Sequence, residues 1–219
     1  MATFGGSIPG SLRRMALATL LVGGGFAAVG AGAFSTFNSS VTSSGQATNS
    51  GTVKIVLGAT GSSANRLTVG AVNIVPGDTI DRSVDLSNDP TNNIALAGVT
   101  LSDSFSPGAT LLSSDSVNGL QLVVSKCSIP WTEAGTAPAY TYTCTGTTSA
   151  VLGSNSSPVP VLQTNAALSN LSVLAGTGGT VDHLLVHLAF PISAGNTFQG
   201  LSTNITYTFT ATQRNGSAQ

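Results

Sequence analysis

The sequence predicts an all-β protein that folds as an antiparallel β-sandwich or jelly roll. Only 7% of the 219 residues are charged, against roughly 25% in a typical soluble domain, so Ser, Thr, Asn and Gly must supply the polar surface. These residues suit strands and turns better than helical bundles. Hydrophobic residues make up 41% of the chain, enough for a core. Short alternating apolar and polar segments, separated by Gly, Pro and Asn turns, are typical of sandwiches.

Residues 1–33 are expected to form a secretory signal peptide with an apolar helix. Arg13 and Arg14 precede an apolar stretch, and the small residues Ala31 and Ala33 indicate cleavage after Ala33. The stretch is shorter than the ~20 residues of a membrane span, and an uncleaved anchor is the alternative. The arginine pair is similar to a twin-arginine signal, but the residues after it favour the general export route. The mature chain is therefore expected to be secreted or held at the cell surface.

Residues 34–50 are expected to be an extended N-terminal segment outside the core. They are mostly Ser, Thr, Asn and Gly, around the apolar residues Phe34, Phe37 and Val41. Because so few apolar residues cannot hold the segment together, it is either disordered or docked as a strand onto another structure.

Residues 51–219 are expected to form a single β-sandwich domain of about eight or nine strands. The clearest alternation lies near the end of the chain, where Ile205, Tyr207 and Phe209 share one face and threonines occupy the other. Gly98 is a candidate β-bulge. The strands expected in order are 52–57, 67–75, 79–86, 94–101, 120–124, 139–143, 159–162, 181–190 and 202–212, while 168–174 is either a short helix or a strand.

Cys127 and Cys144 are the only cysteines. In an exported chain an even pair is typical of a disulfide, so we expect a stapled hairpin or excursion over 127–144. Closing a loop of this size stabilises the folded state by roughly 3 kcal/mol in the chain-entropy model. A redox or metal pair is the alternative, but the spacing fits neither a C-x-x-C motif nor a zinc knuckle.

His183 and His187 are the only histidines, and their spacing is similar to that of the zinc-protease motif H-E-x-x-H. That motif needs a helix and a glutamate that activates water, but Leu184 stands at the glutamate position. The segment also alternates like a strand, on which these histidines would lie roughly 13 Å apart. We therefore expect two histidines on one sheet face, and no metal ligand, catalytic residue or cofactor is assigned.

Four aspartates, Asp78, Asp81, Asp85 and Asp89, lie close together in the sequence. Their spacing lacks the ligand pattern of a calcium-binding hand loop. Asp81 and Asp85 are expected on a solvated strand face. A calcium site built from the turns at Asp78 or Asp89 stays open as an alternative.

Charge and motif content argue against several other functions. With 7 Lys and Arg against 8 Asp and Glu, the chain has no basic surface for neutralising phosphates, so no nucleic-acid partner is expected. The sequence contains no G-x-S-x-G elbow, P-loop or dinucleotide fingerprint. These observations favour a protein that is not an enzyme.

Three stretches, taken together, resemble the TasA/camelysin family of exported bacterial proteins. They are GAGAFSTF at 30–37 with GTVKI at 51–55, VPGDTIDRSV at 75–84, and AGNTFQG at 194–200 leading into ITYTFTATQ at 205–213. The segment from Cys127 through Pro130 and Trp131 to Tyr142, Thr143 and Cys144 is similar to a subgroup with a disulfide loop.

The resemblance implies a jelly-roll-like sandwich that is exported and processed by a dedicated signal peptidase. Family members form surface or biofilm-matrix fibres, in which the mature N-terminus of one subunit adds a strand to the next. The partners implied are further copies of the chain in a head-to-tail filament and an accessory matrix subunit. Phe34, Phe37 and Val41 are the apolar residues available for that docking.

Two other functions remain as alternatives to a fibre subunit. One is a camelysin-like secreted metalloprotease, although the chain has no H-E-x-x-H motif. The other is a monomeric surface binding module or adhesin for carbohydrate or wall polymer, with Trp131, Tyr140 and Tyr142 as its contacts. Packing of these aromatic residues against the disulfide is the simpler interpretation.

Overall fold

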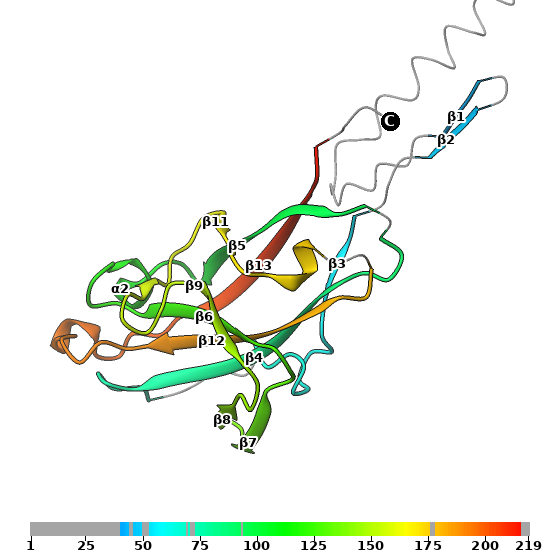
Figure 1. Cartoon of the computed structure of the whole chain (residues 1–219). Coiled ribbons are helices and arrows are strands. Elements are labelled where there is room, and N and C mark those ends of the chain that lie inside the picture. Colours follow the sequence, from blue (N-terminus) through cyan, green and yellow to red (C-terminus); the bar gives the residue numbers. More distant parts are fainter. Residues whose placement is uncertain are drawn as a thin grey trace, which may run out of the picture. The chain divides into compact units, whose positions relative to one another are not determined.

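The computed structural model describes residues 40–43, 46–49, 53–68, 70, 73–92, 94–175 and 178–215. The chain divides into two units, 1–37 and 38–219, and the second holds all the described residues (Figure 1). The expected signal peptide lies outside the described residues. So do its cleavage-site residues Ala31 and Ala33, and the docking residues Phe34 and Phe37.

The larger of the two main sheets is antiparallel, with the strand order β10-β6-β12-β4-β3, and β9 also pairs with β6. Its strands are β3 (Ile55–Leu57), β4 (Thr79–Asn88), β6 (Gln121–Cys127), β9 (Thr148–Leu152), β10 (Val159–Pro160) and β12 (Val181–Ala189). The central strand β12 therefore has the two long strands β4 and β6 as neighbours.

The smaller sheet has the order β11-β5-β13 and is also antiparallel. Its strands are β5 (Leu96–Ser106), β11 (Ala166–Ala167) and β13 (Asn204–Gln213). It lies over one face of the larger sheet (Figure 1). The expected all-β antiparallel sandwich is thus confirmed.

The main core fills the space between these two sheets. Val84 of β4, Leu184 and Val186 of β12 and Leu101 of β5 are all at most 1% exposed. They occupy alternate positions of their strands, as expected where one face of a strand is buried. Arg82 shares the inward face of β4, as the alternation predicts, and it is buried too.

The outward face of the smaller sheet is uncharged and polar. Along β13 the residues at its even-numbered positions 204–210 are exposed, while those between them are partly buried. The register sets Asn204, Thr206, Thr208 and Thr210 opposite Ser106, Ser104, Ser102 and Thr100 of β5.

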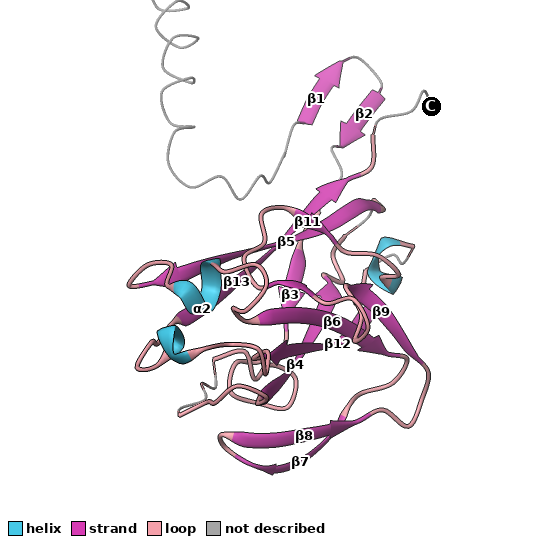
Figure 2. Cartoon of the chain, turned by 90° about the vertical axis from the view of Figure 1, so that its left-hand side faces the viewer, coloured by secondary structure: helices cyan, strands magenta, loops and turns pink. Residues whose placement is uncertain are grey.

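A hairpin lies on the other side of the larger sheet, away from the smaller one (Figures 1 and 2). It consists of β7 (Thr132–Thr136) and β8 (Ala139–Thr143), which pair with each other. The disulfide Cys127–Cys144 closes its base, which confirms the expected bond and the expected hairpin. We call residues 127–144 the flap.

Some expected elements differ from the structure. The described residues of 67–75 lie in no strand. The segment just before them contacts β4 only through an isolated bridge between Asn65 and Val84. Part of 168–174 forms the 3-10 helix η1 (Ser172–Leu174). Strand β9, the short helix α2 (Leu111–Ser114) and the 3-10 helix η2 (Asn196–Phe198) were not expected from the sequence.

Part of the expected extended segment 34–50 forms a small hairpin of its own. Strand β1 (Ser40–Ser43) pairs with β2 (Gln46–Asn49), so Val41, expected to dock elsewhere, stands opposite Thr48. The described chain resumes at Val53, just before β3.

Candidate functional site

Along one side of the sandwich, two strand edges pair with no further strand among those that the structure describes. Strand β3 pairs only with Leu86–Asn88 of β4. Further along the same edge of β4, the amide of Arg66 donates to the carbonyl of Ser83. Among the described strands, none pairs with Thr79–Arg82 on the side away from β12. Strand β13 has β5 on one side and no described strand on the other. Such edges present backbone groups that can accept another strand.

A groove of about 1010 Å³ lies between the sheets at these open edges. Its walls are mainly apolar and come from both sheets and from the loops at this end of the sandwich. They include Ile80, Leu120, Leu188, Phe198, Leu201 and Ile205. A second hollow of about 330 Å³ lies along the same edge of β4, between Thr79–Arg82 and residues 138–141 of the flap.

The inward face of β13 is covered less well than the rest of the core. Ile205, Tyr207, Phe209 and Ala211 pack against the core but are only partly buried. Leu101, on the neighbouring strand β5, is 0% exposed. The sandwich therefore lacks apolar cover on the side of the groove.

The groove also holds a few polar groups. Among the described residues, the hydroxyls of Thr203 and Tyr207 are buried and find no hydrogen-bond partner, and both residues line the groove. Burial raises the pKa of Tyr207, so its hydroxyl stays protonated. The guanidinium of Arg82 also lines the groove, where it donates to the carbonyls of Gly70 and Pro138 at 3.1 and 3.0 Å.

A carboxylate lies next to Tyr207 inside the sandwich. Asp103 of β5 stands opposite Tyr207 in the register and accepts the amide of Gln163 at 3.1 Å. Burial raises its pKa to about 6. An ionisable group thus lies beside the groove.

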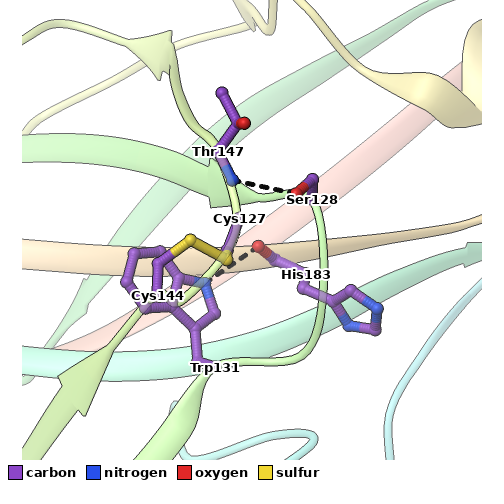
Figure 3. The surroundings of a disulfide bond; sticks show 6 residues. All are labelled: Cys127, Ser128, Trp131, Cys144, Thr147 and His183. Atoms are coloured by element: carbon purple, nitrogen blue, oxygen red, sulfur yellow. Dashed lines mark hydrogen bonds between the residues drawn. A yellow bond between two sulfur atoms is a disulfide. The ribbon is translucent and has the colours of Figure 1, made fainter.

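The flap is anchored to the larger sheet by more than its disulfide. The indole N–H of Trp131 donates to the carbonyl of His183 at 2.9 Å (Figure 3). Val123 and Leu185 face this side of the sheet and are at most 9% exposed, although they do not belong to the main core. The flap and the outer face of the sheet therefore form a small second apolar layer.

The two tyrosines of β8 are held by charged neighbours. Arg66 lies 4.6 Å from the ring centroid of Tyr140 and pairs with Glu133 at 2.6 Å. Glu133 in turn accepts the hydroxyl of Tyr142 at 2.9 Å. The pKa of Glu133 is lowered, chiefly by its hydrogen bond with Arg66. Both tyrosine side chains therefore make contacts within the protein that hold the flap in place.

The two histidines lie on the outer face of β12, as expected. His183 and His187 each place Nδ1 2.7 Å from a carboxylate oxygen of β4, of Asp85 and Asp81 respectively. The register explains both pairs, because each histidine stands directly opposite its aspartate. The described residues contain no group of three or more metal-ligating side chains.

The other two aspartates of the sequence cluster serve their own turns. Asp78 accepts the amide of Val75 at 2.8 Å. Asp89 accepts the hydroxyl and amide of Thr91 and pairs with Lys54 at 3.0 Å. These contacts, with Thr91 the largest, lower the pKa of Asp89 to about 2. The four aspartates therefore act separately in the described structure.

Sequence reasoning missed the groove itself. It identified the inward face of β13, but not that this face would border a cavity. The alternation of apolar and polar residues in β13 was the only available signal, and it indicates which face is buried. Whether the edge of β4 is covered depends on the length of β3, which the sequence pattern does not give.

No protein-family model matches the chain, and no curated protein matches it. In the part of the chain that the structure describes, no helix is both long and apolar enough to cross a membrane.

Proposed function

We propose that this protein is an exported structural subunit of a surface fibre or extracellular matrix, assembled by strand donation between copies. The apolar groove between the two sheets, beside edges of β4 and β13 that no other described strand covers, is the observation that carries this proposal. Export is supported by the disulfide and by the signal-like composition of residues 1–33.

The proposed occupant of the groove is the segment 34–43 of a neighbouring copy. A docked strand gains main-chain hydrogen bonds from an open edge, while its alternate side chains fill the groove. In an extended strand Phe37 and Val41 point to the same face, so both can enter the groove together. They would add the apolar cover that the inward face of β13 lacks.

The length of chain favours docking in a neighbour over docking in the same subunit. The chain enters the larger sheet at the Asn88 end of β4, because Ile55 pairs there. The groove, at Ile80, lies roughly 30 Å away along the strand. With β1 and β2 paired, the chain from Val53 back to Phe37 spans about 30 Å only when fully stretched. A neighbouring groove needs no such taut path.

A subunit that carries both a donor segment and an acceptor groove makes a head-to-tail contact with its neighbour. Such a contact repeats in every added copy, and where its rotation does not close it builds a filament. The proposed partner is therefore a further copy of this chain, with a matrix subunit as an accessory partner. No catalytic role or cofactor forms part of the proposal.

Electron microscopy of the mature chain, residues 34–219, tests the proposal beside a version lacking 34–45. We expect filaments from the first and monomers from the second. A point variant, Phe37→Ser, should also block assembly, whereas Thr36→Ser on the opposite strand face should assemble normally.

Two other outcomes would overturn the proposal. Filaments from both versions would move the joint between subunits away from the segment 34–43. Monomers from both would refute the fibre and favour a monomeric binding module; a drop in thermal stability on truncation would then assign the segment to its own groove.

A further inference from the structure

The tip of the flap is tied to the wall of the groove through Arg82. This residue lies on the inward face of β4 and is 5% exposed. Its Nη2 donates to two carbonyls, that of Gly70 at 3.1 Å and that of Pro138 at 3.0 Å. Gly70 lines the groove, and Pro138 stands in the turn between β7 and β8. One nitrogen atom therefore holds a groove-lining residue and the tip of the flap together.

A second link joins the flap to the same side of the groove. The guanidinium of Arg66 donates to both carboxylate oxygens of Glu133 on β7, at 2.9 and 2.6 Å. We call the described residues of 66–75 the wall loop, because Leu67 and Ile74 within it line the groove. The wall loop is thus attached to the flap at its first residue and again, through the guanidinium on β4, near its middle.

The base of the flap is closed by a covalent bond that a reductant can open. The disulfide joins the two ends of the flap. Without it, the β7–β8 hairpin stays on the sheet only through noncovalent contacts, such as that of Trp131 with the carbonyl of His183 (Figure 3). Because covalent closure of the loop lowers the entropy lost when the flap docks, the contacts of Arg66 and Arg82 with the flap are stronger in the oxidised protein.

Detachment of the flap reaches the inside of the sandwich because Arg82 is buried. A charged donor that loses the carbonyl of Pro138 loses more free energy than a neutral one would. Its side chain is then no longer fixed between two carbonyls, so its hold on Gly70 weakens. The wall loop is the part of the groove that can respond, because its described residues form no strand.

We propose that the flap disulfide is a redox switch for the groove. In the oxidised protein the flap holds the wall loop in place, and in the reduced protein the flap detaches and the wall loop loosens. Disulfides persist in the oxidising surroundings outside the cytoplasm, so the groove would take its final shape there. For fibre assembly this inference rests on the proposed function, because it makes the acceptor groove complete only after the flap is oxidised.

A dithiol reductant supplies the two electrons that open the switch. One of its thiolates attacks the sulfur of Cys144, the more exposed of the two cysteines, and the sulfur of Cys127 leaves as a thiolate that takes up a proton. The second thiol of the reductant then displaces Cys144 and closes a cyclic disulfide. The protein gains two thiols, and the reductant loses two hydrogens.

Hydrogen exchange of the mature chain, residues 34–219, tests the switch in the oxidised and the dithiol-reduced protein. In the wall loop, the amides of Arg66 and Leu67 donate to the carbonyl of Ser83 and the side chain of Asn65. Reduction should speed their exchange at least about tenfold, the effect of losing one hydrogen bond to a charged group.

A turn elsewhere in the fold provides the matched control for this measurement. The amides of Val117 and Asn118 donate to the carboxylate of Asp115, so they too exchange by local opening. Their exchange should change by less than about twofold on reduction, because local opening of one loop does not follow the opening of another.

Two sets of variants test the links without a reductant. Glu133→Gln removes the charge that pairs with Arg66 and should speed exchange in the wall loop while the disulfide is intact. Thr132→Ala, an exposed neighbour on β7, is its control and should leave that exchange unchanged. Cys127→Ala with Cys144→Ala should match the reduced protein and should not respond to the reductant.

The exchange results decide the switch by themselves. Faster exchange within the flap but not at Arg66 and Leu67 would refute it, because the flap would then open without the wall loop. Equal acceleration at Val117 and Asn118 would also refute it, since reduction would then loosen loops in general.

Filament assembly is measured separately, by electron microscopy of the oxidised and reduced mature chains. The oxidised chain should form filaments at a lower protein concentration than the reduced chain. If the oxidised chain forms none, the proposed function fails, and the exchange measurement still decides the switch. If both chains assemble alike although exchange in the wall loop responds, the switch does not control assembly and that part of the inference is wrong.

Discussion

Removing the Cys127–Cys144 disulfide should destabilise the protein by about 3 kcal/mol. The bond joins residues 17 positions apart in the sequence. In the chain-entropy model, a closed loop of this size lowers the entropy of the unfolded chain, which raises the free energy of unfolding by about 3 kcal/mol. Cys127→Ala with Cys144→Ala is the suitable variant, because Cys127 is only 2% exposed and a serine would bury an extra hydroxyl.

The assay is urea unfolding at equilibrium, compared between the wild-type protein and the double variant. A second measurement on the wild type in reducing buffer should give the same loss, while the double variant should not respond to the reductant. Trp131 is the only tryptophan, and its indole N–H bonds to the carbonyl of His183. Its fluorescence therefore reports the flap directly.

Val123 and Leu185 are buried on the outer face of the larger sheet, the side on which the flap lies. If the flap opens before the sandwich unfolds, the Trp131 signal will change at lower urea than the far-ultraviolet circular dichroism. A loss below about 1 kcal/mol, or an equal response of both proteins to the reductant, would refute the reasoning that the closed loop stabilises the fold.

The remaining predictions concern buried polar and close-packed positions, each checked by urea unfolding. Burial raises the pKa of Asp103 to about 6, so the folded state binds its proton more tightly than the unfolded state. Between about pH 4 and pH 6 this group loses stabilising effect as pH rises. The difference in the free energy of unfolding between the wild type and Asp103→Asn should therefore favour the wild type more at pH 4 than at pH 7, by about 1 kcal/mol after allowing for solvent screening. A difference that does not change with pH would contradict this. Asp182, 2% exposed, pairs with Lys126 at 3.1 Å, and Asp182→Ala should cost about 3 kcal/mol by leaving the charge of Lys126 unpaired; a loss near zero would show that water replaces the carboxylate. A methyl group at Gly119 would lie 2.4 Å from the carbonyl of Asp115, so Gly119→Ala should cost about 2 kcal/mol, whereas the control Gly108→Ala, which meets open space, should stay near the wild type.

The faces of the long strands could be predicted from the sequence because one face of each is buried. In β13, Ile205 and Tyr207 alternate with exposed threonines, and in β12 the core residue Leu184 alternates with His183 and Leu185. Such alternation is local and needs no knowledge of the neighbouring strand.

The expected strand over 67–75 was wrong because an apolar residue has more than one way to be buried. Leu67 and Ile74 do pack against the core, but they do so from a loop, and both line the groove. The sequence shows that such residues need cover; it does not show whether their backbone pairs with β4.

The groove could not be predicted because it is a property of two sheets together. It depends on the end of β3 at Leu57, because β3 pairs only with Leu86–Asn88 and no other described strand pairs with β4 on that side. Residues far apart in the sequence, such as Ile80 and Ile205, then form its walls.

The hydroxyl-covered outer face of the smaller sheet has a consequence for how such molecules meet side by side. Rows of threonine and serine on β13 and β5 carry no ionic charge, so two of these faces can approach each other without electrostatic repulsion. Dissolved salt acts by screening charge and therefore leaves that approach almost unchanged. If copies assemble into filaments as proposed, lateral bundling through this face would depend on hydration and shape, and it would proceed alike in fresh water and in brine.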